Sequence, residues 1–174
     1  MPETTLEILL VEDEKAHIEL IRRAFSSRSE KVSFQIAHTL EEASSQLARK
    51  SFDLVLLDFL LPDGKGLELL PPNKEEADCP YMLMTSHGDE KLAVEALKAG
   101  ALDYVVKSAE NLVAMPSFVN RVLREWSLIQ ERRKAEEALR LSEEKFRTIA
   151  DYSMDLGIWL GVDGHLLWVN RSIE

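Results

Sequence analysis

Five polar side chains stand where short apolar runs of the sequence end, and together they could handle a phosphoryl group. Glu12 and Asp13 follow the run LEILLV, and Asp58 ends the run LVLLD. Thr85 ends the run YMLMT, and Lys107 ends the run DYVVK. In such a set an aspartate can act as the nucleophile, while a hydroxyl, an ammonium group and a metal held by acids bind the oxygens of the transferred group. This chemistry requires that all five side chains meet in one place.

The runs that end in these residues have the composition of buried strands. Five such runs, bounded by polar, Gly or Pro residues, cover residues 6–12, 32–38, 52–58, 81–86 and 102–107. Amphipathic stretches that predict helices lie between them; Thr39 and Glu42 open one as a capping box, and Gly100 ends another. Pro71 and Pro72 predict that the helix after the third strand is short. The alternation predicts an α/β fold, a doubly wound parallel sheet with helices on both faces.

The predicted sheet brings the polar strand ends together. Ligands of an open parallel sheet bind beyond the carboxyl ends of its strands. Glu12, Asp13 and Asp58 should therefore meet at one edge, where three carboxylates would repel one another strongly. A hard divalent cation relieves such repulsion, and oxygen ligands with room for water suit Mg²⁺. The sequence predicts a Mg²⁺ site at this edge, with Lys107 as a second counter-charge.

Composition and charge restrict the partners. The chain has 174 residues, 45% of them hydrophobic, which suits one domain with a buried core and an appendage. Its formal net charge of -10 disfavours direct binding to nucleic acid or to an anionic membrane. The single Cys79 cannot form an internal disulfide, and the four histidines lack metal-ligand spacing. No secretion signal stands out and no apolar run approaches the ~20 residues of a membrane span, so we expect a cytoplasmic location with no membrane partner for this fragment.

The polar positions also occur in a known order. The acid pair in LLVEDE, the aspartate in LLDFLLPDG, the threonine in LMTS and the lysine in DYVVK resemble the receiver domain of bacterial two-component response regulators. The resemblance covers residues 6 to about 125. It implies a flavodoxin-like fold, with five parallel strands in the order 2-1-3-4-5. It also implies a phosphoacceptor switch rather than an enzyme, with Asp58 taking the phosphoryl group from a phosphohistidine on a histidine kinase or a histidine phosphotransfer protein.

The resemblance implies a role for each matching position. The Mg²⁺ ligands would be Glu12, Asp13, Asp58 and the backbone carbonyl of Leu60. The residues for phosphoryl binding and switching would be Thr85, Lys107 and the aromatic switch residue Tyr104. The neighbours that could modulate the site are Phe59, Ser86 and His87. The family usually has a proline after the lysine, often in a cis peptide bond. Here Ser108 follows it, and a cis bond to a non-proline residue costs roughly 2.5–4 kcal/mol, so the resemblance does not carry that bond to this position.

The region after residue 108 predicts a long helix. Residues 117–149 contain neither Gly nor Pro, and Pro116 suits a helix start. About 30 helical residues extend ~50 Å, more than one domain face can cover. A heptad seam follows Leu128, Ala135, Leu139, Phe146 and Ile149. This seam predicts a homodimer through a coiled coil, and the alternative is a single solvated helix.

The last residues resemble the opening of a PAS sensory domain. LGIWL, the turn GVDGH and LLWVN predict a β-hairpin after the helix. We therefore expect a receiver domain at 1–125, a linker helix with a possible coiled coil at 126–145, and the N-terminal fragment of a PAS domain at 146–174. The chain would then be part of a longer protein that relays a change at Asp58 to an output region.

Two other functions compete with the switch. A Mg²⁺-dependent phosphatase of the haloacid dehalogenase type also uses an aspartate nucleophile at a strand end, but it places a second acid two residues later, where this sequence has Leu60. A receiver that acts only as a docking module would not need phosphorylation. The complete set of five polar residues argues against the docking module.

Overall fold

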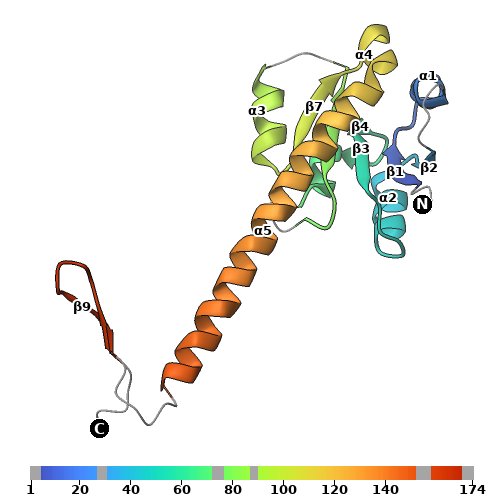
Figure 1. The fold of residues 1–174 in the computed structure, drawn as a ribbon. Coiled ribbons are helices and arrows are strands. Elements are labelled where there is room, and N and C mark those ends of the chain that lie inside the picture. Colours follow the sequence, from blue (N-terminus) through green and yellow to red (C-terminus); the bar gives the residue numbers. More distant parts are fainter. Residues whose placement is uncertain (1–4, 27–30, 72–76, 87–89, 152–157, 170–174) are drawn as a thin grey trace. The chain divides into compact units, whose positions relative to one another are not determined.

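The computed structural model describes residues 5–26, 31–71, 77–86, 90–151 and 158–169. Five parallel strands form one sheet in the order β2-β1-β3-β6-β7, which confirms the predicted order of the five strand runs (Figure 1). The strands are β1 (Leu6–Val11), β2 (Val32–Ala37), β3 (Leu54–Asp58), β6 (Tyr81–Thr85) and β7 (Asp103–Val106). The helices are α1 (Lys15–Ser26), α2 (Leu40–Leu47), α3 (Glu90–Lys98), α4 (Ala109–Val113) and α5 (Met115–Asp151). The predicted doubly wound α/β fold is confirmed.

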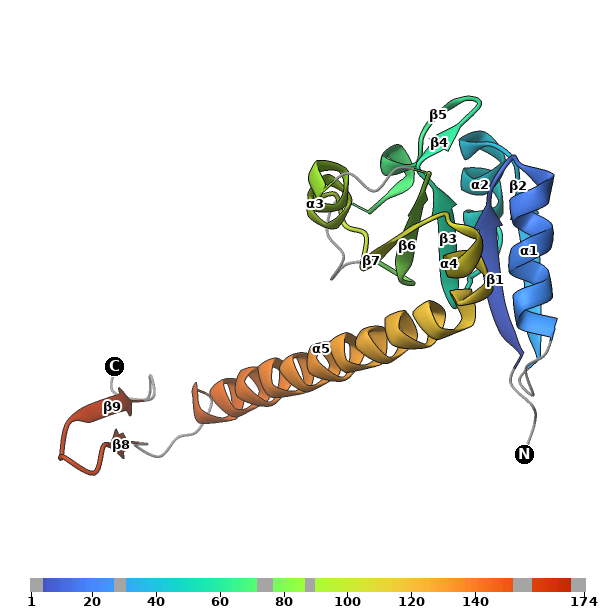
Figure 2. The ribbon, with the colours of Figure 1, turned by 90° about the horizontal axis from the view of Figure 1, so that it is seen from above.

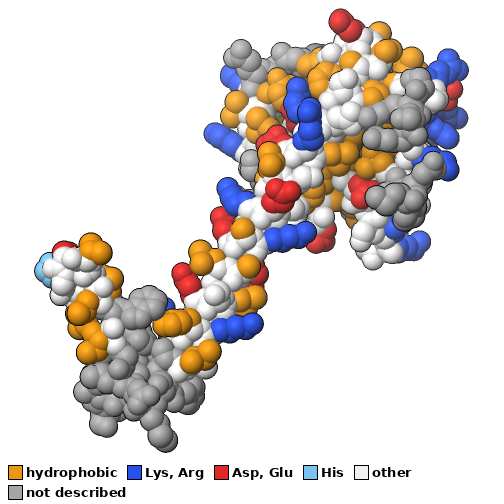
Figure 3. All heavy atoms as spheres, viewed as in Figure 1, with side chains coloured by type: hydrophobic (Ala, Val, Ile, Leu, Met, Phe, Trp, Pro, Cys, Tyr) orange, Lys and Arg blue, Asp and Glu red, His pale blue; other side chains and the backbone are white. Residues whose placement is uncertain are grey.

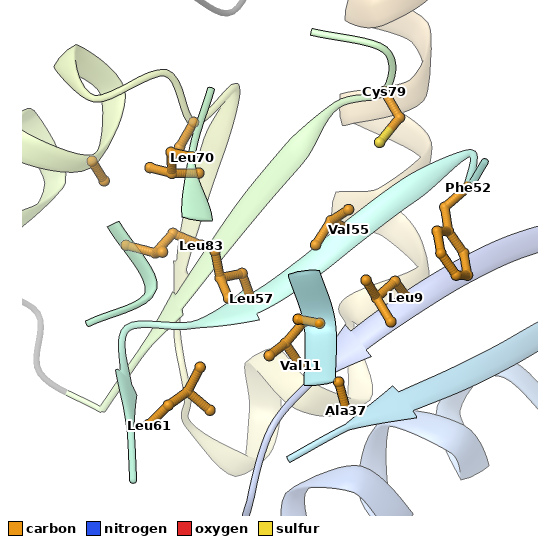
Figure 4. Close-up of a cluster of buried hydrophobic side chains, with 13 residues drawn as sticks. Leu9, Val11, Ala37, Phe52, Val55, Leu57, Leu61, Leu70, Cys79 and Leu83 are labelled. Carbon is orange, nitrogen blue, oxygen red and sulfur yellow. The ribbon is translucent and has the colours of Figure 1, made fainter. Parts of the chain in front are cut away.

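The two faces of the sheet follow the alternation of side chains along each strand. One face carries Leu9, Val55, Leu57 and Leu83, which form a buried cluster with residues of α2, α3 and the 3-10 helix η1 (Gly66–Leu69) (Figure 4). The intervening strand residues are fully buried as well: Ile8, Leu10, Leu54, Leu56, Met82 and Met84. Helix α1 and the beginning of α5 supply their own buried apolar residues, among them Ile21 and Val119. Helices α1 and α4 pack against each other (Figure 2).

The segment after β3 contains an element that the sequence did not reveal. Strands β4 (Leu60–Leu61) and β5 (Gly64–Lys65) form a small antiparallel hairpin directly after Asp58. The short η1 follows, so the prediction of a short helix before Pro71 is confirmed. The N–H of Gly66 donates to the carbonyl of Phe59 at 2.8 Å. This bond closes the hairpin against the end of β3.

Helix α5 is 37 residues long, as the absence of Gly and Pro predicted. The chain divides into two compact units, residues 1–128 and residues 129–174, and the boundary falls inside this helix. In the first unit, Val119 and Val122 of α5 are buried. In the second unit, the helix is exposed, and acidic, basic and hydrophobic side chains alternate along it (Figure 3). Among the described residues, no helix has both the length and the apolar content that crossing a bilayer demands.

The second unit also contains the predicted hairpin. Strands β8 (Ile158–Leu160) and β9 (Leu166–Val169) pair antiparallel around a turn in which Gly164 has a φ of 83°. A turn position with positive φ favours Gly, because Gly has no Cβ to clash there. The sequence therefore predicted this local element correctly.

We predict that Gly66→Ala destabilises the fold where β3 ends. A Cβ at this position would lie 2.2 Å from the backbone carbonyl oxygen of Asp58 and 3.0 Å from Cγ of Leu57. Neither neighbour can move without shifting β3, so the free energy of unfolding in urea should fall by about 1–3 kcal/mol.

Gly64→Ala is the matched control, because its Cβ would meet only the flexible ends of the Leu40 and Glu68 side chains, at 2.8 Å and 3.2 Å. Its loss of stability should be clearly smaller. Equal losses for the two variants would show that the close approach of Gly66 to Asp58 does not constrain the fold.

Candidate functional site

The strand register brings the polar strand ends to one edge of the sheet. Asp58, the last residue of β3, pairs with Met84, and Thr85, the last residue of β6, pairs with Val106. Glu12 follows β1, and its N–H donates to the carbonyl of Ala37 at the end of β2. Each of these residues is placed by a backbone ladder rather than by its own side chain. The predicted convergence at the carboxyl edge is thus a consequence of parallel pairing.

Lys107 lies at the centre of the charge cluster. Its Nζ donates to Oδ2 of Asp58 at 2.7 Å and to Oε2 of Glu12 at 3.0 Å. The exposed fractions of the three side chains are 4% for Lys107, 7% for Asp58 and 0% for Glu12. Buried carboxylates are costly unless they are paired and hydrogen-bonded, and Lys107 supplies both. It is the partner that the buried position of Asp58 requires.

Asp13 completes an acidic cluster that could hold a metal. One carboxylate oxygen from each of Glu12, Asp13 and Asp58 lies within 4.8 Å of the others, and Asp13 is exposed to solvent. Three carboxylates against one ammonium group leave an excess of negative charge. Oxygen donors with one side open to water are the ligand set that Mg²⁺ takes in proteins. The residues present therefore fit a Mg²⁺ ion.

The pKa values of Asp58 and Lys107 are both raised above their ordinary values. Desolvation is the largest cause that raises the pKa of Asp58, the hydrogen bond from Lys107 opposes it, and the negative Glu12 adds to it. Burial alone would lower the pKa of Lys107, but the bonds to Asp58 and Glu12 outweigh it and hold that pKa above its ordinary value. The ammonium form of Lys107 is thus locked in place by its two carboxylates.

The remaining predicted residues lie around this cluster. Thr85 is buried, and its carbonyl accepts the N–H of Lys107 at 2.7 Å. Tyr104 and Phe59 are half-buried against the apolar cluster, and Ser86 is exposed. Leu60 is the first residue of β4, and 66% of its surface is exposed. His87 lies outside the described residues.

Ser108 has a structural role of its own. The Lys107–Ser108 peptide is not cis. The Ser108 hydroxyl accepts the N–H of Asn111 at 3.1 Å and caps α4. The residue that replaces the usual proline therefore starts the next helix.

Two histidines that the sequence did not single out lie beside Glu12. Nδ1 of His17, in the first turn of α1, is 3.5 Å from Oε1 of Glu12 and 3.2 Å from Oε2 of Glu14. Nδ1 of His38 is 3.1 Å from the backbone carbonyl oxygen of Glu12. His38 follows β2, the strand beside β1, so its position at the carboxyl edge was a usable signal. His17 gave no such signal, because its contact depends on how α1 packs.

We predict that Lys107→Met destabilises the protein in a pH-dependent way. Without the ammonium group the pKa of Asp58 should rise further, since the one cause that lowers it most is gone. Ionisation of Asp58 would then oppose folding at high pH, and protonation would relieve this at low pH. Urea unfolding should show a loss of about 3–5 kcal/mol at pH 8, with a smaller loss at pH 5.

Lys50→Met is the control, because Lys50 pairs with Glu7 at the surface, at 2.9 Å. Its effect should stay below about 1 kcal/mol at both pH values. A Lys107→Met variant whose loss of stability does not change with pH would contradict the assigned charge coupling.

Comparisons with known proteins agree with this geometry. The family model described as "Response regulator receiver domain" matches residues 8–116. The chain is 35% identical over 131 residues to the methanogenesis regulatory protein FilR1 of Methanothrix harundinacea, an alignment that covers 72% of this chain and 29% of FilR1. The chain thus spans less than a third of the length of this relative.

Two solved structures share the fold. The phosphorylated cyanobacterial phytochrome response regulator RcpA is 25% identical with a TM-score of 0.58, and the match covers 64% of this chain and 89% of RcpA. The Mn(2+)-bound response regulator Rcp1 is 25% identical with a TM-score of 0.56, and the match covers 63% of this chain and 88% of Rcp1. With the five-stranded sheet, the acidic cluster at its edge and the family model in agreement, the chain belongs to the response regulator receiver domain family, whose members are phosphoacceptor switches of two-component signalling rather than catalytic enzymes.

Proposed function

We propose that Asp58 is the phosphoacceptor of this domain and that a phosphohistidine on a histidine kinase or a histidine phosphotransfer protein is the donor. The observation that carries the proposal is the Asp58 carboxylate at the sheet edge, 2.7 Å from the Lys107 ammonium and beside Glu12 and Asp13. A carboxylate oxygen of Asp58 would attack the phosphorus, so that a P–O bond forms while the P–N bond breaks. The leaving imidazole keeps the electron pair and takes up a proton. The phosphorylated state of the similar RcpA supports this assignment.

The other site residues would each bind part of the transferred group. Glu12, Asp13, Asp58 and the backbone carbonyl of Leu60 would hold Mg²⁺, which supplies positive charge against the phosphoryl oxygens. The Mn²⁺ form of the similar Rcp1 supports a divalent cation. Lys107 would turn from Asp58 to one phosphoryl oxygen, and the hydroxyl of Thr85 would bind another.

The signal would leave the site through β6 and β7. A phosphoryl group that draws Thr85 and Lys107 toward it stabilises one arrangement of these strand ends over the other. Tyr104 lies on β7, half-buried, where its ring could adjust to the position of Thr85. Phe59, Ser86 and His87, next to the phosphoacceptor and the switch threonine, would modulate access to the site. The surface that changes would include α3, β7 and the start of α5.

We further propose that the chain has three parts: a receiver domain at 1–125, a linker helix at 126–145 and the start of a PAS domain at 146–174. The heptad seam of this helix supports a parallel homodimer. Leu128, Leu139 and Ile149 occupy heptad positions, and their exposed fractions are 67%, 62% and 72%. A second copy offers the same seam in register, and mixed charges flank it. A change at the base of α5 would then reach the PAS region through the paired helices.

We predict that acetyl phosphate with Mg²⁺ labels the chain once and that Asp58→Asn abolishes the label. An amide has no anionic oxygen with which to attack phosphorus. Intact mass spectrometry should show one added phosphoryl group on the wild type and none on the variant. Asp78→Asn, at the opposite edge of the sheet and exposed, should be labelled like the wild type. Labelling of Asp58→Asn at the wild-type level would refute the phosphoacceptor assignment.

We predict that the chain sediments as a dimer and that Leu139→Glu makes it monomeric, because a buried charge at a heptad core position is costly. Sedimentation equilibrium is the measurement. Val94→Glu on α3 is the control, since Val94 is also exposed, at 49%, but lies outside the seam. A dimer that Val94→Glu breaks and Leu139→Glu leaves intact would place the interface on the receiver domain instead.

A further inference from the structure

Glu12 is the most completely enclosed member of the acidic cluster. Its Oε2 accepts from Lys107 at 3.0 Å, and its Oε1 accepts from the N–H of Glu14 at 3.1 Å. Its backbone carbonyl contacts His38 at 3.1 Å, and its side chain has no exposed surface. A carboxylate buried to this degree needs partners for its oxygens, either hydrogen-bond donors or a metal ion.

His17 holds a donor position that the described structure leaves unused. Its Nδ1 is buried and has no hydrogen-bond partner within the described part of the chain. The same atom is 3.5 Å from Oε1 of Glu12 and 3.2 Å from Oε2 of Glu14. A buried polar atom without a hydrogen bond calls for an explanation. The neighbouring carboxylate of Glu12 would change its partners if Lys107 moved away.

That change follows from the position of Lys107. One ammonium group binds both Asp58 and Glu12 here. If it turns to a phosphoryl group on Asp58, Glu12 loses the donor on Oε2. The loss would leave a fully buried carboxylate with one hydrogen-bond donor besides the proposed metal ion, unless its side chain turns and takes a new donor. Of the side chains described around Glu12, His17 has a ring nitrogen near the carboxylate that makes no hydrogen bond, although Oε2 of Glu14 also lies 3.2 Å from it.

We propose that His17 is a positioning residue for the metal cluster: it holds the carboxylate of Glu12 toward Asp13 and Asp58 when Lys107 is drawn away. The inference rests on the proposed phosphoacceptor function. A small turn of either side chain converts the 3.5 Å contact into a hydrogen bond. His17 thereby keeps Glu12 available to the metal, without touching the metal or the phosphoryl group itself. This role differs from a surface pair between His17 and Glu14, whose carboxylate is 57% exposed.

Binding of Mn²⁺ to the full chain, measured with and without the phosphoryl mimic beryllofluoride on Asp58, tests this role. The electron paramagnetic resonance signal of free Mn²⁺ gives the dissociation constant, and thermal unfolding in EDTA reports stability without metal. His17→Phe keeps a ring but removes the donor, so the dissociation constant should rise about 10-fold with the mimic bound and clearly less without it. The unfolding temperature in EDTA should stay at or above that of the wild type, because an unpaired buried nitrogen is removed. His17→Asn, whose amide can donate from a similar position, should recover most of the affinity.

Two further variants separate the possible outcomes. Glu14→Gln removes the other carboxylate that faces His17 and keeps the backbone N–H, so Mn²⁺ affinity should stay at the wild-type value. Wild-type affinity in His17→Phe, or an equal loss in Glu14→Gln and His17→Phe, would overturn the positioning role. Asp13→Ala reports on the site itself. If the wild type and Asp13→Ala bind Mn²⁺ equally, both the proposed metal site and the role of His17 are wrong. If Asp13→Ala loses binding and His17→Phe does not, the metal site is supported and only the role of His17 is wrong.

Discussion

A buried ammonium group shared by two buried carboxylates is the interaction on which the site depends. Lys107 binds Asp58 and Glu12 in an environment that excludes nearly all solvent. Charges in such a place interact strongly, and removing one leaves the others without compensation. The ammonium can therefore leave Asp58 only when something else of suitable charge arrives. This condition agrees with the proposed phosphorylation of Asp58.

The same lysine connects the strands that carry the site. Its side chain reaches from the end of β7, at one edge of the sheet, to residues that follow β1 and end β3. Its backbone N–H is bonded to the carbonyl of Thr85. A displacement of the Lys107 side chain is thus coupled to the end of β6 and to the strand that contains Tyr104. Coupling between the acidic cluster and the outer strands follows from contiguous bonds.

The backbone that follows β3 encloses Asp58 on the other side. The β4-β5 hairpin follows Asp58 at once, and Gly66 approaches the Asp58 carbonyl so closely that a Cβ would lie 2.2 Å from it. The bond from Gly66 to Phe59 fixes this approach. Asp58 is held in place by the backbone, whereas Lys107 and Glu12 meet through their side chains, which could exchange partners as proposed. Such a division would let charge rearrange without moving the proposed phosphoacceptor.

The sequence by itself determined the parallel sheet and the five polar strand ends, because parallel pairing aligns the carboxyl ends of all strands whatever the details of packing. The strand order was implied by the resemblance to receiver domains. It also determined the long helix and the terminal hairpin, which follow from local composition. It could not reveal the β4-β5 hairpin, because strands of two residues have no periodic pattern. Only the tertiary structure decided that Lys107 binds Glu12, 95 residues away, and that His17 and His38 lie beside the same acid. Those contacts depend on strand register and helix packing, which set side-chain distances that no spacing in the sequence encodes.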